Sequence, residues 1–200
     1  LESLHLHETP VASLPAFPQL KILKMNTTRV DDLTPLAKTS LVELSLHNLK
    51  IKDLSPLANL PLKFLYANNL QTNDFSILKK LRLENFQAPG LWLDLDLLAQ
   101  HPLKELRLAG PKTGDLQILR NFPLETLYIS TNPWRDRQAL KSMPKLFTLN
   151  GKQRDQALAE LEAYCQLFDS WAREVRKQPI PEQIKAVENK LVELNKAFLG

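Results

Sequence analysis

Residues 30–40 read VDDLTPLAKTS, and residues 51–61 read IKDLSPLANLP. The shared pattern Asp-Leu-Ser/Thr-Pro-Leu-Ala thus recurs after 21 residues. A repeat of this length is typical of solenoid proteins, whose units bury their apolar side chains only by stacking on one another. The chain has 42 leucines among 200 residues, which agrees with a repetitive apolar core.

A second motif, Leu-x-x-Leu-x-Leu, surrounds this pattern. Its copies begin at Leu1, Leu20, Leu41, Leu62, Leu78, Leu103, Leu124 and Leu146. The intervals are 19, 21, 21, 16, 25, 21 and 22 residues, so we expect the fifth unit to be shifted locally. Each copy predicts a short strand with its middle leucine pointing inward, and stacked units would place parallel strands about 4.8 Å apart.

The Asp-Leu-Ser/Thr-Pro pattern has the chemistry of a turn. We expect Asp32 and Asp53 to accept backbone N–H groups at a bend, and Thr34 and Ser55 to cap a short return helix. The proline that follows suits the first helical position, where no N–H is needed. The pattern begins again at Asp74 and Asp115. A row of metal-binding carboxylates is the disfavoured alternative, because each Asp precedes an apolar residue.

These motifs resemble the leucine-rich-repeat family over residues 1 to about 151. The resemblance implies an α/β solenoid of about seven to eight repeats, with a curved, short-stranded parallel sheet on the concave face. Its convex side would be irregular, 3-10 or short helical. The family usually has Asn at position nine of each unit. That position holds Thr9, Thr28, Leu49, Leu70, Phe86, Pro111 and Asn132.

The stretch LWLDLDLLAQHP at residues 91–102 is irregular. Its alternation of apolar and polar residues could form an extra strand. We prefer a bulged return segment in which Asp94 or Asp96 caps a short helix through Gln100.

Residues 152–200 form a separate segment. Apolar residues at spacings of three and four predict two amphipathic helices, interrupted at QPIP, residues 178–181. We expect an α-helical hairpin that caps the last repeat. A dimerising or partner-binding arm is the alternative reading.

The tail also resembles one group of bacterial leucine-rich-repeat proteins. The likeness rests on LFTLNGK at residues 146–152 and AVENKLVELNKAFLG at residues 186–200, although Gln153 and Lys196 stand where that group has proline. The group's repeats frequently follow a Ser/Thr protein kinase domain. The resemblance implies a longer parent protein and gives this segment no kinase activity.

The composition of the chain excludes several classes of function. The net charge of +4 is too interspersed for a nucleic-acid surface, and no apolar run is long enough to cross a membrane. The single cysteine, Cys165, cannot form an internal disulfide and is expected to be buried. We therefore expect a soluble, cytoplasmic location.

No catalytic, cofactor or metal motif is recognisable. His5, His7 and His47 share one face of the strands, but strand spacing places His47 about 10 Å from the other two. We therefore predict a non-enzymatic segment with no cofactor and no metal.

Positions three, five and seven of the motif face the concave side, and in the fifth unit these are Lys80, Arg82 and Glu84. Aromatic residues with arginine are typical of interface hot spots. We predict that a protein or peptide with some acidic character binds this face. The predicted binding residues are Lys24, His47, Phe64, Tyr66, Arg82, Arg107 and Tyr128. A solvated face with incidental aromatic residues is the alternative.

Overall fold

The computed structural model describes residues 1–72, 74–89, 93–108 and 116–199, with side chains described up to residue 193. The chain divides into two compact units, Leu1–Leu158 and Ala159–Gly200. The division falls within one helix, a few residues after the predicted boundary at 151.

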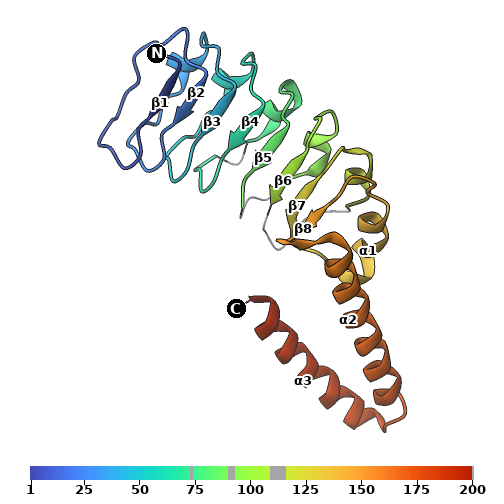
Figure 1. The fold of residues 1–200 in the computed structure, drawn as a ribbon. Coiled ribbons are helices and arrows are strands. Elements are labelled where there is room, and N and C mark those ends of the chain that lie inside the picture. Colours follow the sequence, from blue (N-terminus) through green and yellow to red (C-terminus); the bar gives the residue numbers. More distant parts are fainter. Residues whose placement is uncertain (73, 90–92, 109–115, 200) are drawn as a thin grey trace. The chain divides into compact units, whose positions relative to one another are not determined.

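The first unit is a sheet of nine strands whose spatial order is the order of the chain (Figure 1). The strands are β1 (Ser3–His5), β2 (Ile22–Lys24), β3 (Glu43–Ser45), β4 (Phe64–Tyr66), β5 (Asn85–Gln87), β6 (Glu105–Leu108), β7 (Thr126–Ile129), β8 (Thr148–Leu149) and β9 (Lys152–Gln153). Strands β1 to β8 are parallel, and β9 pairs antiparallel with β8.

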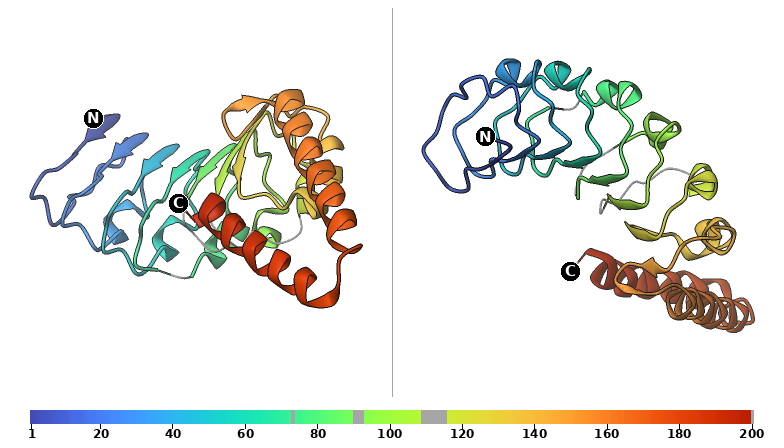
Figure 2. Two further views of the ribbon diagram at one scale, coloured as in Figure 1. Left: turned by 90° about the horizontal axis from the view of Figure 1, so that it is seen from below. Right: turned by 45° about the horizontal axis from the view of Figure 1, so that its top comes forward.

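Short 3-10 helices return the chain between strands on the opposite side of this unit (Figure 2). They span Thr34–Leu36, Ser55–Leu57, Ser76–Lys80, Leu95–Leu98 and Leu116–Asn121. The predicted α/β leucine-rich-repeat solenoid, with strands on one face and 3-10 segments on the other, is confirmed.

The core is a column of inward-facing side chains, one from each of the strands β2 to β8. Leu44, Leu65, Phe86, Leu106 and Leu127 are each at most 1% exposed. Burying one such side chain contributes roughly 1.5–3 kcal/mol, and only the neighbouring units provide that burial.

The predicted turn chemistry is confirmed for the aspartates and revised for the hydroxyl residues. Asp32 and Asp53 each accept a hydrogen bond from the backbone N–H two residues later, at 2.8 and 2.7 Å. Thr34 and Ser55 are the first residues of the 3-10 helices and form no side-chain cap; the Asp two residues earlier accepts their N–H groups instead. Asp74 repeats the arrangement with Ser76 at 2.9 Å, whereas Asp115 lies outside the described residues.

The fifth strand is not where the motif search placed it. Strand β5 starts at Asn85, so the repeat unit begins at Leu83 rather than Leu78. Leu78, within the 3-10 helix Ser76–Lys80, and Leu81, directly after it, are both buried, which explains why the sequence matches the motif there. In the true register the intervals around this unit become 21 and 20 residues.

Two further elements depart from the predictions. Asn150 and Gly151 adopt φ values of 50° and 81° and join β8 to β9 as a tight hairpin, which was not predicted. Asn132 is the N-cap of α1 (Pro133–Lys141) rather than part of an Asn ladder, and its Oδ1 accepts the N–H groups of Trp134 and Arg135. Both are ordinary roles for Asn beside Gly or Pro.

Thr9 and Thr28 do part of the work of the missing asparagines. Each hydroxyl donates to the backbone carbonyl three residues earlier, at 3.3 Å. In the irregular stretch, Asp94 caps a 3-10 helix by accepting the N–H of Asp96, as predicted, but the helix spans Leu95–Leu98 and ends before the predicted Gln100. Leu91 and Pro111 lie outside the described residues.

The two C-terminal helices are confirmed as α2 (Arg154–Val175) and α3 (Ile180–Leu199). A short turn at residues 176–179 joins them, in the region of the predicted interruption. Cys165 is 1% exposed, as expected.

Candidate functional site

The concave face of the sheet presents side chains in rows, because equivalent residues of neighbouring strands are paired. Position five of the motif gives the row Lys24, Ser45, Tyr66, Gln87, Arg107 and Tyr128. Position three gives the row Ile22, Glu43, Phe64, Asn85, Glu105 and Thr126. Residues about 21 positions apart in the chain are therefore neighbours on this face.

We call Lys24, Phe64, Tyr66, Arg107 and Tyr128 the central concave patch. These five predicted residues lie on strands β2, β4, β6 and β7 and are all half-buried. The sixth, His47, lies beside the patch just after β3.

Arg82, the seventh predicted residue, is not on this face. It precedes β5, and its guanidinium donates to the backbone carbonyl and the side-chain oxygen of Gln100, at 3.0 and 3.1 Å. Lys80 belongs to a 3-10 helix, and Glu84 contacts Lys63 and Lys104 instead. The concave positions of this unit are Asn85 and Gln87, which the shifted motif hid.

Each cation of the patch is paired with a carboxylate of the same face. Lys24 Nζ lies 2.8 Å from Glu43 Oε1, and this hydrogen bond raises the pKa of Lys24. Arg107 Nε lies 2.6 Å from Glu105 Oε1. The concave face therefore presents two ion pairs here rather than a positively charged surface.

Glu105 is fixed by three donors from two rows. Besides Arg107, Asn85 donates to its Oε2 at 2.7 Å and Gln87 to its Oε1 at 3.0 Å. A carboxylate held this way keeps one geometry, and it holds the Arg107 guanidinium in place.

Arg107 also lies over an aromatic ring. Its Cζ is 4.0 Å from the centroid of the Tyr128 ring, a cation–π contact. Gly151, in the β8–β9 hairpin, lies against the same tyrosine, and a Cβ on this glycine would be 3.4 Å from the Tyr128 hydroxyl. The ring is therefore confined between an ion pair and a backbone turn.

Tyr66 occupies the middle of the patch. Burial is the main cause of its raised pKa, and the negative charges of Glu43 and Glu105 add to the effect. The phenol is therefore neutral at physiological pH and can act as a hydrogen-bond donor.

A polar cluster borders the patch at position seven. Asn26 Oδ1 accepts the Ser45 hydroxyl at 2.8 Å and the backbone N–H of His47 at 3.2 Å. The His47 ring contacts the side chain of Asn68. Burial and the nearby His7 lower the pKa of His47, so its ring is neutral above pH 6.5.

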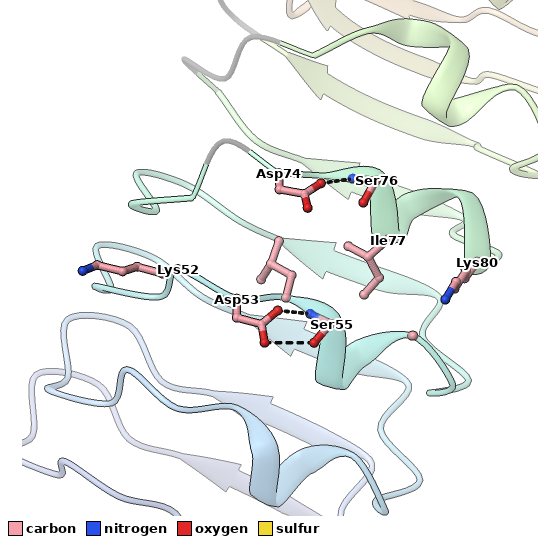
Figure 3. Close-up of a pocket in the computed structure, with 9 residues that line it drawn as sticks. Lys52, Asp53, Ser55, Asp74, Ser76, Ile77 and Lys80 are labelled. Atoms are coloured by element: carbon pink, nitrogen blue, oxygen red, sulfur yellow. Dashed lines mark hydrogen bonds between the residues drawn. The ribbon is translucent and has the colours of Figure 1, made fainter.

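The hollow drawn in Figure 3 lies on the other side of the solenoid and measures about 150 Å³. It separates two successive return segments. Its carboxylates, Asp53 and Asp74, bind the turns that contain Ser55 and Ser76, so it is a gap between units rather than a second site.

Among the described residues, no group of three or more His, Cys, Asp or Glu side chains is placed to hold a metal ion. Within the same residues, no helix is both long and apolar enough to cross a membrane. The arrangement on the concave face offers hydrogen bonds, aromatic surface and paired charges, which suit binding.

Comparison with known proteins finds likenesses among solved structures. No protein-family model matches the chain, and no curated protein matches its sequence. Among solved structures, the chain is similar to the internalin InlF of Listeria monocytogenes, with a TM-score of 0.58 and 25% sequence identity. The match covers 74% of this chain and 47% of the internalin chain, so this chain corresponds to less than half of that protein. InlF is a leucine-rich-repeat protein, and the shared architecture together with the repeat motif and strand register identifies the fold of this chain as a leucine-rich-repeat solenoid.

Proposed function

We propose that this chain is a non-catalytic protein–protein interaction module that binds a protein or peptide on its central concave patch. The observation that carries the proposal is the fixed geometry of the patch: Arg107 is held by Glu105 and lies over Tyr128. Side chains ordered before binding lose little conformational entropy when a partner arrives. Tyrosine and arginine are also the residue types most often found at binding hot spots.

The charge pairing changes the expected partner. Lys24 and Arg107 are neutralised by Glu43 and Glu105, and Arg82 does not reach this face. The proposal therefore no longer includes an acidic partner. A segment with an apolar or aromatic side chain for Tyr66, flanked by hydrogen-bonding groups, fits better.

The test uses peptides selected against the wild-type chain from a random library. We expect their affinity to fall at least about 30-fold in Tyr66→Ala and in Arg107→Gln, which corresponds to the loss of a hot spot of about 2 kcal/mol. Arg82→Gln is the matched control, because it removes the same group from a neighbouring unit off the patch. Equal affinity in all variants, with unchanged melting temperatures, would refute the patch as the binding site.

We also propose that the module belongs to a larger cytoplasmic bacterial protein. In the alternative form of this proposal it recruits substrate to, or regulates, a Ser/Thr protein kinase. This form rests on the resemblance of residues 146–152 and 186–200 alone. Immunoblotting of source cells with an antibody against this chain tests it. A band near 22.9 kDa would contradict a longer parent, and a larger band would be assayed for kinase activity.

A further inference from the structure

Asn85, in the middle of the concave face, has an amide oxygen without a partner. The residue is 9% exposed and lies on β5, where it is paired with Phe64 of β4. Its Nδ2 donates to Glu105 Oε2 on β6 at 2.7 Å, which fixes the orientation of the amide. Its Oδ1 is buried and accepts from no described residue. A buried acceptor that stays unpaired costs free energy, so a ligand that brings a donor to it gains affinity.

The unpaired oxygen points toward β4. The two polar atoms of an amide diverge from one carbon, so an Asn85 side chain whose nitrogen reaches β6 turns its oxygen back toward Phe64. The Phe64 ring is half-buried on the concave face. Because Oδ1 is covered in the free chain, we expect this ring to turn aside when a ligand binds, a side-chain change that is common at interfaces.

On the β3 side, Phe64 is flanked by a carboxylate. Glu43 is paired with Phe64 in the sheet register. Its Oε1 binds Nζ of Lys24, which lies on β2, on the opposite side of Glu43 from Phe64. No further donor contacts the Glu43 carboxylate within the part of the chain that the structure describes. An ionised carboxylate has about four acceptor positions, so Glu43 can take a second donor from the β4 side.

On the β6 side, the charges are arranged alike. The Arg107 guanidinium extends toward β7, where it lies 4.0 Å from the centroid of the Tyr128 ring. Glu105 instead reaches toward β5, where two side-chain amides donate to it. Besides burial, the charges of Glu43 and Glu105 raise the pKa of Tyr66 on β4. The space over β4 therefore lies at the negative ends of both ion pairs, with the cations farther out.

We propose that the concave face binds an arginine side chain of its protein or peptide partner over Phe64, between Glu43 and Asn85. The guanidinium lies on the Phe64 ring, a favourable cation–π contact, and donates to Asn85 Oδ1 and to the Glu43 carboxylate. Strand spacing places these two residues about 10 Å apart, a span that a planar group with five donors can bridge. This proposal rests on the proposed function and names one side chain of the partner.

The first test uses N-acetyl-arginine amide as the probe. It is titrated into the full, isotope-labelled chain, and nuclear magnetic resonance follows the side-chain amide of Asn85. We expect saturable shifts with a Kd of about 1 mM, the order for a ligand of this size. N-acetyl-citrulline amide, which has nearly the same shape without the charge, should bind at least about 10-fold more weakly. Equal shifts with both probes, or no shift with either up to about 10 mM, would overturn the proposal.

A second test uses the peptides selected from the random library, and it separates this proposal from the proposed function. Peptides that lose affinity in Tyr66→Ala should share an arginine, and its replacement by citrulline should weaken binding about 10-fold. Glu43→Gln should remove most of that difference. Glu84→Gln is the matched control and should keep the difference, because it removes the same charge from a carboxylate that contacts Lys63 and Lys104 off the concave face.

The outcomes for the arginine site and for the patch are distinct. Peptides that depend on Tyr66 but share no arginine, or whose citrulline forms bind equally well, would overturn the arginine site and leave the proposed function standing. Peptides that bind Tyr66→Ala normally and are unaffected by citrulline would overturn both. Melting temperatures of Glu43→Gln and Glu84→Gln check that each variant is folded.

Discussion

Position eight of the repeat, just after each strand, is where the backbone enters the left-handed region. Glu8, Thr27, Asn48 and Asn69 have φ values of 52°, 56°, 56° and 51°. The conformation directs the N–H of Thr27 to the carbonyl of His47 at 2.8 Å and thereby links neighbouring units. Asparagine adopts this region readily, whereas a β-branched residue such as Thr27 is strained there.

Thr27→Asn should therefore stabilise the chain. We expect the free energy of unfolding to rise by about 1 kcal/mol, because the strain of threonine in this region is relieved. Urea denaturation measures the change. The reverse substitution, Asn48→Thr, should lower stability, and more strongly, since Asn48 also accepts a hydrogen bond from Asn69 at 3.0 Å. A loss of stability in Thr27→Asn would show that strain is not limiting there.

His101 makes stability depend on pH. It is 4% exposed, its Nδ1 accepts the N–H of Leu83 at 2.9 Å, and burial lowers its pKa below the ordinary 6.5. Below pH 6.5 the unfolded chain takes up a proton that the folded chain excludes, so stability falls as pH falls from 6.5 toward the folded pKa. Above pH 6.5 this contribution is fully present.

We expect His101→Asn, which keeps an acceptor for Leu83, to lose less stability than wild type between pH 7 and pH 5. Denaturation curves at each pH measure the difference. His47, whose pKa is also lowered, contributes to the same window, and His47→Asn separates its share. If wild type and His101→Asn lose stability in parallel, His101 is not the titrating group.

At the scale of the element, strand β5 shows how far a motif can be read. Leu78, Leu81 and Leu83 fit the consensus better than the true strand, which has Phe86 and Ala88 at its inward positions. Parallel pairing decides between the two registers, because each strand must pair at the same place in a unit of nearly constant length. Gln87, which is 21 residues after Tyr66, is its actual pairing partner in the sheet. The repeat length therefore predicts the correct register, whereas the leucine motif predicts the wrong one.

Some features of the candidate site also follow from the motif, whereas others depend on the register between strands. The motif placed Lys24, Phe64, Tyr66, Arg107 and Tyr128 on one face from the alternation within each strand. The fixing of Glu105 by Asn85 and Gln87 depends on the register between strands, which the shifted motif had lost. The confinement of Tyr128 by Gly151 depends on the β8–β9 hairpin, although Asn-Gly is a strong hairpin signal.

Position two of the unit forms a charge ladder across neighbouring units. Glu84 lies 3.0 Å from both Lys63 and Lys104, and their hydrogen bonds lower the pKa of Glu84. The two lysines are exposed and Glu84 is half-buried, so salt should screen these interactions. The ladder supports the register of β4, β5 and β6 from outside the core.

We expect Glu84→Gln to lower the melting temperature at low ionic strength, where charges act over about 30 Å. The difference from wild type should narrow in roughly 1 M salt, where that range is about 3 Å. Glu2→Gln, which breaks a single pair with Lys21, should have a smaller effect. A difference that does not change with salt would indicate that packing, not charge, is affected.

At the scale of the whole molecule, stability is distributed along the repeats. In β1 the central Leu4 is only half-buried, whereas Leu44 of β3 is fully buried between neighbouring strands. Solenoids lose structure unit by unit, because each unit is stabilised only by its neighbours. The amides of β1 should therefore open before those of β3.

Hydrogen exchange can compare two equivalent amides. Leu6 N–H donates to the carbonyl of Lys24, and Leu46 N–H donates to the carbonyl of Tyr66, both at 2.7 Å. We expect Leu6 to exchange at least roughly 100-fold faster, because its unit opens locally. Equal protection would mean that the first unit unfolds only together with the rest.

Because the strands keep a constant register, the residues on the concave surface can be changed without changing the buried core. Units at residues 20–40, 41–61 and 62–82 have the same length, so removing the middle one leaves every inward leucine in place. The concave face, however, is formed by residues of neighbouring strands. Removing the middle unit would therefore set Lys24 directly beside Tyr66. Inserting, deleting or exchanging whole units can thus change the binding surface of such a molecule while the packing of its core stays the same.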